Sequence, residues 1–589
     1  MFTLAIHFGH DSNAALFDQK GLIGAVQEER LARRKNIGGW PRLSIEWLLS
    51  NSGANIEACK FVIVGKDALY ESSGGNLTNL YARFHDRLTP KFLDALLISL
   101  DNLFQIGIRS YIIKRLIKKK LIELGSKDPC IEFVDHHEAH AYGAFFSSGF
   151  TEAMVLTLDG KGDRQSGSVY TFDFTHKGLS VEKIASVSDC SSIGLIYSVV
   201  TSILGFRANR HEGKITGLAA RGGDSINAKF PLDHSSGELT SLFDCQNCST
   251  WSIFVKFFCY SPTKFYKFLF SGNNPWQTLI SYKVLDFVGN IKYKSKEDLS
   301  FWVQKNTERV VLEYLAHFNE RNQTSNLCVA GGLFANVLLN QRIREAISPK
   351  KLFVMPNMGD GGLAYGAGVK VSKLNPGAAF LTSVYTGPEY SDEQIMETIT
   401  SHGLELLKPL NVTSFAADLL ASGKIIGIFK GRLEWGPRSL CNRSVIAYPS
   451  IGMGEILNSR LGRSDFMPFA PIILEEDANI ILVGYNKSQD KVRHMTSTYS
   501  VSRRFDEFSS IIHVDGTIRP QVVTNEYDPV IWGILKRCKD KNGYGVLINT
   551  SYNLHEEPIV CSPEDAVTTA KRGAVDYILF NDKYLVKIN

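Results

Sequence analysis

The sequence contains no apolar run long enough to cross a bilayer. A spanning helix needs about 18 uncharged apolar residues, and the longest candidate, residues 92–113, is interrupted by Asp101 and Arg109. The first residues, MFTLAIHFGHD, have no basic stretch and no small-residue cleavage site, so we interpret them as a first strand rather than a signal peptide. We therefore expect a cytoplasmic protein without a membrane span.

Excess charge of one sign and paired cysteines are also scarce. Sixty-five basic and 60 acidic residues leave a net charge of +5 over 589 residues, which gives little support for a nucleic-acid partner. Of ten cysteines, only Cys245 and Cys248 form a CxxC pair, and one such pair is weak evidence for zinc or redox chemistry. With 44% hydrophobic residues and only 19 prolines, the chain is globular, and its length predicts two to four domains.

Three short apolar runs separated by polar turns occur twice. Residues 2–8, 14–18 and 22–27 form the first set. Residues 153–158, 168–174 and 179–185 form the second. The repetition, about 150 residues apart, indicates an internal duplication. Two related α/β lobes with a nucleotide between them are the actin–hexokinase plan, although strand–glycine–strand segments also occur in other α/β proteins.

The character of the sequence changes near residue 376, at the connector LNPGAAFLTSVYTGPEYSDEQ. Its proline, glycine and serine residues are typical of a linker. We therefore expect one domain over residues 1–375 and another over residues 376–589. Residues 225–300 are rich in aromatics and predict a helical insertion that covers a pocket or an oligomer interface.

The segment VDHHEAHAYGA is a candidate metal site. Asp135 ends an apolar strand and can cap the following helix, which places His136 and His140 on one helix face. Asp159 in LTLDGKGD and Asp360 in PNMGDGG lie in glycine-rich turns. Two imidazoles and two carboxylates suit iron, manganese or zinc, although the two aspartates could instead only shape their turns.

Two further kinds of turn carry candidate ligand contacts. His10 and Asp11 follow the first strand in FGHDSNAAL, where a neutral imidazole could accept a proton from a hydroxyl. Gly331 and Gly332 precede a helix in AGGLFANVLLN, and Lys214 lies in GKITGLAARGG. Bare glycine amides can approach phosphate, but neither segment is a P-loop or a Rossmann motif.

The C-terminal third gathers arginines beside glycine and proline turns. The positions are Arg432, Arg438, Arg443, Arg463 and Arg519. A strand end, LINTSYN, adds the polar residues Asn549, Thr550, Ser551 and Asn553. Such a set can form a pocket for phosphate or carbamate, whereas exposed arginines are often only solvated charge.

These segments, together with GRLEWGPRSLCNRS, MPFAP, HVDGTIRPQ and EPIVCSPEDA, resemble in order the carbamoyltransferases of the nodulation-factor and antibiotic-tailoring type. The resemblance extends from Thr3 to Tyr584. It implies an α/β protein with two domains: a duplicated actin-like domain that binds metal and ATP, and a twisted α/β sheet domain similar to the threonylcarbamoyl-adenylate synthase fold. It also implies ATP-dependent transfer of a carbamoyl group from carbamoyl phosphate, through a carbamoyl-adenylate, to the hydroxyl of a small molecule. Magnesium-bound ATP would be the co-substrate, and a homodimer is the expected assembly.

The resemblance also implies roles for individual residues. The metal ligands would be His136, His140, Asp159 and Asp360, with iron as the first expectation. The base would be His10, with Asp11 beside it, and the nucleotide contacts would be Lys214, Gly331, Gly332 and Asn336. The carbamoyl phosphate contacts would be Arg438, Arg443, Arg519 and Ser551, to which we add Arg463 and Asn549 from the same cluster.

Three positions depart from the family pattern. Many relatives carry histidine where Asn36 stands, and lysine and arginine where Leu461 and Met467 stand. The phosphate pocket could therefore be less cationic, with Arg460 or Arg463 compensating. A tRNA threonylcarbamoyl transferase, a non-catalytic nucleotide-binding scaffold and a sugar kinase of the actin-like class remain alternatives.

Overall fold

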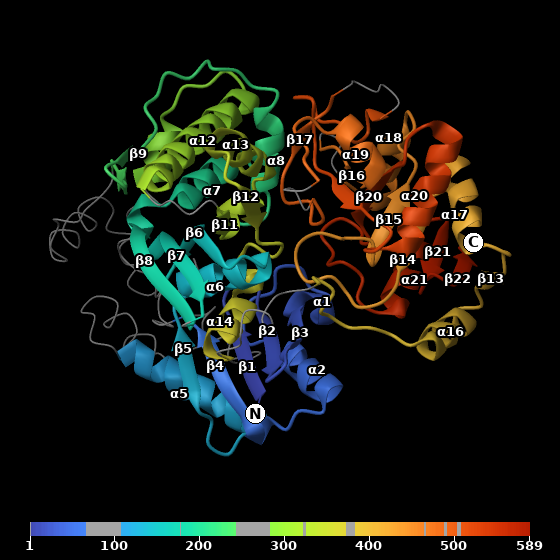
Figure 1. The fold of residues 1–589 in the computed structure, drawn as a ribbon, viewed down its shortest axis with the longest axis horizontal. Helices are drawn as coiled ribbons and strands as arrows, with labels where there is room; N and C mark the ends of the chain where they lie inside the picture. The colour runs from blue at the N-terminus through green and yellow to red at the C-terminus, as the bar shows by residue number, and fades with distance from the viewer. Residues whose placement is uncertain are drawn as a thin grey trace. The chain divides into compact units, whose positions relative to one another are not determined.

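The computed structural model describes residues 2–65, 108–176, 178–242, 283–321, 326–372, 383–463, 467–487, 492–502 and 508–588. These form two compact units (Figure 1). The first unit contains Met1–Glu28, Asn36–Ala335 and Ala346–Thr382, and the second contains Glu29–Lys35, Asn336–Glu345 and Ser383–Asn589. The expected boundary near residue 376 and the Cys245–Cys248 pair lie outside the described residues, whereas residues 383–394 at the end of the expected linker are described.

The first unit contains two five-stranded sheets with the same strand plan. The first sheet has the order β3-β2-β1-β4-β5, from β1 (Phe2–His7), β2 (Asn13–Asp18), β3 (Gly21–Gln27), β4 (Cys59–Val64) and β5 (Ile131–Val134). The second has the order β12-β11-β6-β7-β8, from β6 (Glu152–Gly162), β7 (Gln165–Thr175), β8 (Gly178–Ser188), β11 (Asn326–Ala330) and β12 (Lys351–Val354). In each sheet three antiparallel strands are followed by two parallel ones. Both predicted three-strand sets are therefore present.

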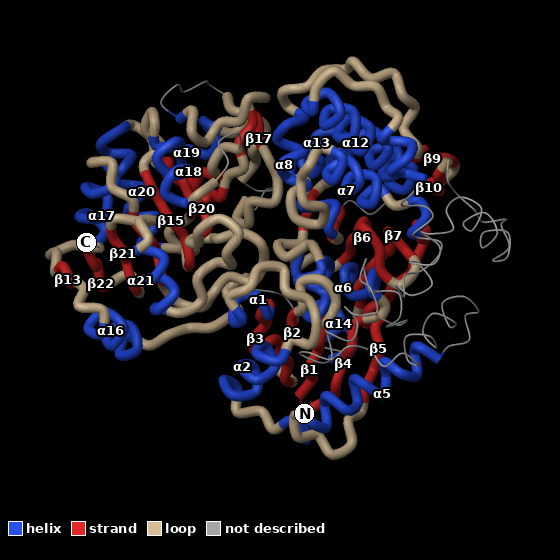
Figure 2. Tube along the Cα trace, turned by 180° about the vertical axis from the view of Figure 1, so that it is seen from behind, coloured by secondary structure: helices blue, strands red, loops and turns tan. Residues whose placement is uncertain are grey.

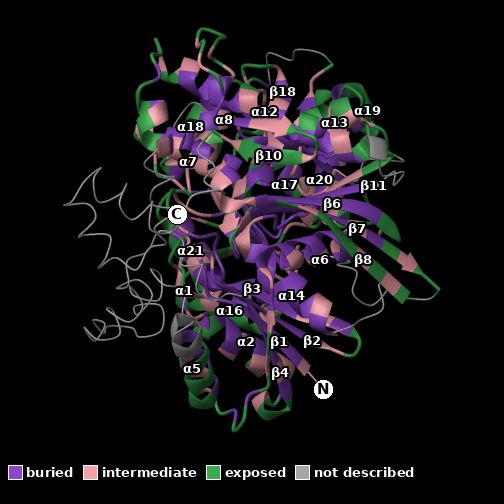
Figure 3. Ribbon diagram, turned by 90° about the vertical axis from the view of Figure 1, so that its left-hand side faces the viewer, coloured by how far each residue is buried: buried purple, intermediate pink, exposed green. Residues whose placement is uncertain are grey.

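Two helices lie against these sheets and against each other. Helix α14 (Leu363–Ser372) packs on β1, β2 and β4, and α6 (His136–Ser148) packs on β6, β7 and β11 (Figure 2). Other helices of this unit include α2 (Arg42–Ser52), α5 (Ile108–Glu123), α7 (Ile193–Ile203), α8 (Glu212–Ala219) and α12 (Lys296–Arg321). A small hairpin consists of β9 (Leu232–Ser235) and β10 (Glu238–Ser241). Figure 3 shows β1 and β2 buried, whereas α5 is exposed along most of one side.

The crossing of α6 and α14 depends on glycine. An ideal Cβ on Gly366 would lie 1.8 Å from the carbonyl oxygen of Ala139. We predict that Gly366→Ala lowers the free energy of unfolding by about 1–3 kcal/mol, because the helices must move apart. Urea unfolding would measure this change. The matched control is Gly213→Ala in α8, where nothing lies within 4 Å of the added methyl and stability should rise by up to about 1 kcal/mol. Equal stabilities of the two variants would contradict the prediction.

The second unit is built on an eight-stranded mixed sheet with the order β13-β22-β21-β14-β15-β20-β16-β19. Its strands are β13 (Glu405–Leu407), β14 (Ile426–Phe429), β15 (Arg443–Ala447), β16 (Ala470–Leu474), β19 (Gln521–Val523), β20 (Val546–Ser551), β21 (Tyr577–Phe580) and β22 (Tyr584–Lys587); β17 (Tyr499–Ser500) pairs separately with β18 (Thr517–Ile518). Its helices are α13 (Val337–Ile347), α16 (Asp392–Ser401), α17 (Val412–Ala421), α18 (Met453–Leu461), α19 (Glu475–Ile481), α20 (Pro529–Asn542) and α21 (Pro563–Lys571).

A segment from the N-terminal region forms part of this second unit. Helix α1 (Glu28–Ala32) opens it, and the Arg30 guanidinium donates to the carbonyl of Gly436 at 2.7 Å. Arg33 donates to the carbonyls of Pro558 and Ile559. Arginine–carbonyl bonds of this kind fix the segment over residues distant in sequence, which a linear domain boundary does not capture. Among the described residues no helix is long and apolar enough to cross a membrane.

Candidate functional site

The four predicted metal ligands converge in the first unit. One donor atom from each of His136, His140, Asp159 and Asp360 lies within 4.8 Å of all the others. Oδ2 of Asp159 is 3.0 Å from Nε2 of His140 and 3.5 Å from Nε2 of His136. Oδ1 of Asp360 is 3.7 Å and 4.0 Å from the same two nitrogens. The fold therefore brings the two histidines and the two aspartates together at one point.

This arrangement fits a first-row divalent ion. Two donors each about 2.1 Å from one ion, and about 90–140° apart around it, are about 3.0–3.9 Å from each other. The four histidine–carboxylate separations of 3.0–4.0 Å lie close to that range. The whole group extends to 4.8 Å, so an ion would draw the donors closer together. Burial raises the pKa of Asp159, but the hydrogen bonds and charges of the two histidines outweigh it, so the pKa is well below its ordinary value. The ionised carboxylate is the form that binds metal.

Local structure holds the two histidines in place. The side chain of Asp135 accepts from the backbone N–H groups of His137 and Glu138, which confirms its predicted role as the cap of α6. Asp163, which the sequence analysis missed, accepts from the backbone N–H of His136 at 2.8 Å. Gly162 leaves space for the imidazole, since a Cβ there would lie 2.1 Å from the His136 ring.

Asn13 connects the turn after β1, which contains Asp11, to the turn before α14, which contains Asp360. Its side-chain amide donates to the carbonyls of Asp11 at 2.8 Å and Asp360 at 2.9 Å, and its oxygen accepts from the N–H of Ala364. The buried His7 places Nε2 3.1 Å from the carbonyl oxygen of His10 and 3.7 Å from Oδ2 of Asp360. The proposed base and one proposed metal ligand are therefore fixed relative to each other.

His10 and Asp11 lie together in the turn after β1. Nδ1 of His10 is 3.0 Å from Oδ2 of Asp11, and the imidazole is 31% exposed, so a ligand can reach it. Burial raises the pKa of Asp11, but the hydrogen bond and charge of His10, with a hydrogen bond from Asn36, leave it below the ordinary value. The carboxylate is therefore an acceptor for the imidazole N–H.

The four predicted nucleotide contacts lie in different local environments. Gly331 has a φ of 103°, and a Cβ there would lie 2.1 Å from the carbonyl oxygen of Leu158. Gly332 lies beside the carboxylate of Asp159. Lys214 lies on α8 with its Nζ 5.7 Å from the centre of the Phe206 ring. Asn336, which belongs to the second unit, accepts from the N–H of Leu339 at the start of α13.

Three arginines gather in the second unit without a carboxylate partner among the described residues. Burial and the charges of Arg438 and Arg463 place the pKa of Arg519 well below its ordinary value. Burial lowers the pKa of Arg438 to about 10, and burial together with Arg438 lowers that of Arg463 to about 10. Arg463 also donates to the hydroxyl of Thr550 at 3.0 Å. Like charges held together without an acid form a site suited to an anion.

Other residues predicted to contact carbamoyl phosphate make hydrogen bonds within the protein itself. Arg443 is 0% exposed and donates to the carbonyls of Pro388, Lys430, Gly431 and Asn442. Arg432 likewise donates to backbone carbonyls, of Thr386 and Gly387. Asn549 is buried and donates to the carbonyl of Ser439 and to Gln521. We therefore assign Arg443 and Asn549 to support of the pocket, whereas the half-buried Ser551 stays a predicted contact.

The departures from the family pattern have local explanations. Leu461 is 1% exposed and belongs to the hydrophobic core of the second unit. Arg460 pairs with Asp576 at 2.9 Å, so its charge is already compensated. Met467 is half-buried. Of the two predicted compensating arginines, Arg463 is the one in the arginine cluster.

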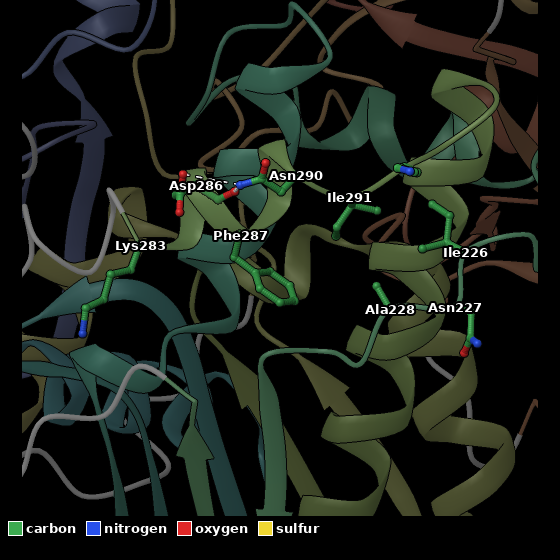
Figure 4. Close-up of a pocket in the computed structure, with 9 residues that line it drawn as sticks. Ile226, Asn227, Ala228, Lys283, Asp286, Phe287, Asn290 and Ile291 are labelled. Atoms are coloured by element: carbon green, nitrogen blue, oxygen red, sulfur yellow. Dashed lines mark hydrogen bonds between the residues drawn. The ribbon is translucent and has the colours of Figure 1, made fainter.

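The first unit also contains a hollow formed by residues 226–228 and 283–292. It has a volume of about 720 Å³ and is lined by Ile226, Asn227, Ala228, Lys283, Asp286, Phe287, Asn290, Ile291 and Lys292. Figure 4 shows Ile291, Ala228 and Ile226 to the right of the Phe287 ring. It lies at the described ends of the predicted 225–300 insertion, whose residues 243–282 fall outside the described part. It shares no residue with the predicted metal ligands.

Comparisons with known proteins extend over nearly the whole chain. Residues 3–369 match the family model described as carbamoyltransferase N-terminus, and residues 417–587 match that of the carbamoyltransferase C-terminus. An uncharacterized protein of Methanocaldococcus jannaschii is 27% identical over 99% of both chains. Nodulation protein NolNO of Sinorhizobium fredii is 30% identical over 98% of this chain and 79% of that protein. The 3'-hydroxymethylcephem-O-carbamoyltransferase of Amycolatopsis lactamdurans is 28% identical over 45% of this chain and 50% of its own.

Proposed function

The chain belongs to the carbamoyltransferase family, and from this premise we propose that it is an ATP-dependent O-carbamoyltransferase. The donor is carbamoyl phosphate, the intermediate is a carbamoyl-adenylate, and the acceptor is the hydroxyl of a small molecule. The convergence of two imidazoles and two carboxylates within 4.8 Å carries the proposal. A purely structural nucleotide-binding scaffold has no need for this donor set.

The first unit would perform the transfer. His136, His140, Asp159 and Asp360 would hold a divalent ion, with iron as the first candidate and manganese or zinc as alternatives. When bound, such an ion supplies Lewis-acid polarisation of a carbonyl. His10 accepts the proton of the acceptor hydroxyl as its oxygen attacks the carbamoyl carbon. The bond from that carbon to the adenylate oxygen breaks, and AMP leaves with the electron pair.

The second unit would form the adenylate. Arg438, Arg463 and Arg519 bind the phosphate of carbamoyl phosphate, because three cations without an acid partner compensate its charge. Carbamoyl phosphate, water and ATP then give carbamoyl-adenylate, phosphate and pyrophosphate. Lys214, Gly331, Gly332 and Asn336 remain the proposed nucleotide contacts. The acceptor would be an alcohol, of the kind that the name 3'-hydroxymethylcephem-O-carbamoyltransferase gives for one relative.

Pyrophosphate release tests this proposal before any acceptor is known. The full chain is incubated with magnesium and ATP, with or without carbamoyl phosphate. We expect release only when carbamoyl phosphate is present. A pool of glycosides is added in a second series to supply an acceptor that completes the site.

Two results would contradict the proposal. Release that ignores carbamoyl phosphate would indicate a different nucleotide chemistry, such as that of a kinase. Absence of release with and without the glycosides would leave a non-catalytic scaffold. Salt-sensitive binding of tRNA would instead favour a threonylcarbamoyl transferase, because affinity built on phosphate contacts falls steeply with salt.

A further inference from the structure

Two turns of the first unit are joined beside the proposed base. The N–H of Ser12 donates to the carbonyl of Ile37 at 3.0 Å, and the N–H of Gly39 donates to that of Phe8 at 3.1 Å. Gly38 permits this approach, because a Cβ there would lie 2.7 Å from the carbonyl oxygen of Gly9. The turn of residues 36–39 is therefore held against the turn of residues 9–12.

Asn36 uses this contact to reach the carboxylate of Asp11. Its Nδ2 donates to Oδ1 of Asp11 at 2.9 Å, while Oδ2 of the same carboxylate is 3.0 Å from Nδ1 of His10. An ionised carboxylate only accepts hydrogen bonds, which fixes the donor side of the Asn36 amide and orients Nδ1–H of a neutral His10 toward Asp11. The three side chains form one hydrogen-bonded series.

The series determines which nitrogen of His10 can act as a base. A neutral imidazole carries one proton, and a carboxylate at Nδ1 favours the tautomer with the proton on that atom. The lone pair is then on Nε2. We propose that Asn36 is a positioning residue that, through Asp11, holds His10 in the tautomer whose Nε2 accepts the proton of the acceptor hydroxyl. This inference rests on the proposed role of His10 in transfer.

Without Asn36, the Asp11 carboxylate could bind His10 in a second orientation. Its carboxylate could rotate and offer His10 a different oxygen at a different angle, because only one of its two oxygens would be restrained. The hydrogen bond from Asn36 also contributes to the low pKa of Asp11, after burial and the interactions of His10. Asn36, which stands where many relatives carry histidine, therefore restrains the Asp11 carboxylate in this turn.

The backbone conformation at Asn36 tolerates two substitutions that test its side chain. Asp11 and Asn36 have φ values of 53° and 52°, in the left-handed region that glycine, asparagine and aspartate tolerate. Asn36→Gly removes the donor and keeps that conformation. Asn36→Asp keeps the shape but places a second carboxylate against Asp11. The two variants separate the side-chain bond from the turn itself.

The direct test is the tautomer of His10. Two-bond proton–nitrogen correlation spectra of the full chain labelled with [15N]histidine report which ring nitrogen is protonated, and loss of one pattern in His10→Gln assigns the signal. We expect a single Nδ1–H tautomer in the native protein. In both Asn36 variants we expect a mixture that includes the Nε2–H or doubly protonated ring.

Transfer to the glycoside pool supplies the second readout. We expect the turnover of transfer to fall about tenfold in Asn36→Gly and further in Asn36→Asp, while pyrophosphate release is retained. The matched control is Asn55→Ala, which removes a cap that accepts from the N–H of Glu57 at 2.9 Å and should change neither readout. An unchanged His10 tautomer in both Asn36 variants would overturn the inference.

The same variants distinguish this inference from the proposed function. If His10→Gln transfers at the native rate, the assignment of the base is wrong, whatever Asn36 does. If His10→Gln loses transfer but both Asn36 variants keep the native tautomer and turnover, the base stands and the positioning role is wrong.

Discussion

His136→Ala is expected to abolish carbamoyl transfer and to lower the bound metal. Nε2 of His136 is 3.5 Å from Asp159 and 3.7 Å from Asp360, so its loss leaves three of four proposed ligands. The remaining imidazole and two carboxylates would hold a transition ion less tightly, because imidazole nitrogen is a favoured ligand for such ions. Metal content per folded chain, measured by elemental analysis, and transfer to the glycoside pool would check this prediction.

His137→Ala is the matched control. His137 is also fully buried on α6, but its Nδ1 is 2.9 Å from the hydroxyl of Thr157, and it is not among the four clustered residues. We expect this variant to lose stability yet keep its metal. Native metal content and full transfer in His136→Ala would place the metal site elsewhere.

Removal of the metal should separate the two half-reactions. After treatment of the native protein with a chelator, we expect transfer to stop while pyrophosphate release continues, because neither the arginine cluster nor the proposed nucleotide contacts include any of the four metal ligands. Readdition of iron, manganese and zinc in turn should restore transfer with the preferred ion. Loss of pyrophosphate release at the same chelator concentration, with magnesium kept in excess, would contradict the prediction that only transfer needs the bound metal.

Short-range features of the fold could be predicted because their causes are local. The polar turns between apolar runs define β1–β3 and β6–β8, and the acidic end of β5 defines the start of α6 through the cap at Asp135. The spacing of His136 and His140 then follows from helix geometry. The grouping of these histidines with Asp159 and Asp360 is predicted from the chemistry of the four side chains and from the family resemblance, and the structure brings the four together.

Features that depend on tertiary packing could not be predicted. Nothing in the sequence of Glu29–Lys35 indicates that it belongs with residues more than 400 positions away, since its arginines bind backbone carbonyls that any residue offers. Asp163 acts through one hydrogen bond to the backbone of His136, and Asn13 acts through bonds to the backbone of Asp11, Asp360 and Ala364. The motif containing Arg443 indicated an anion contact, but full burial and bonds to four carbonyls make that guanidinium part of the fold.

Arg519→Ala is expected to weaken the use of carbamoyl phosphate without changing metal content. A hydrogen bond to a charged group contributes about 1.5–3 kcal/mol, so the apparent KM for carbamoyl phosphate in pyrophosphate release should rise about 10- to 100-fold. The metal ligands lie in the first unit and Arg519 in the second. Steady-state kinetics and elemental analysis of the same preparation would measure both quantities.

The stability of Arg519→Ala should change in the opposite direction from its activity. Burial and the charges of Arg438 and Arg463 disfavour the Arg519 cation in the free protein, so its removal relieves repulsion that only a bound anion compensates. We expect thermal stability without carbamoyl phosphate to be equal to or above that of the native protein, and stabilisation by added carbamoyl phosphate to be lost. Arg460→Ala is the control, because this arginine has Asp576 as its partner; it should lose some stability and keep its KM. A native KM in Arg519→Ala would place the phosphate in another pocket, and a marked loss of stability would show that Arg519 supports the fold rather than the ligand.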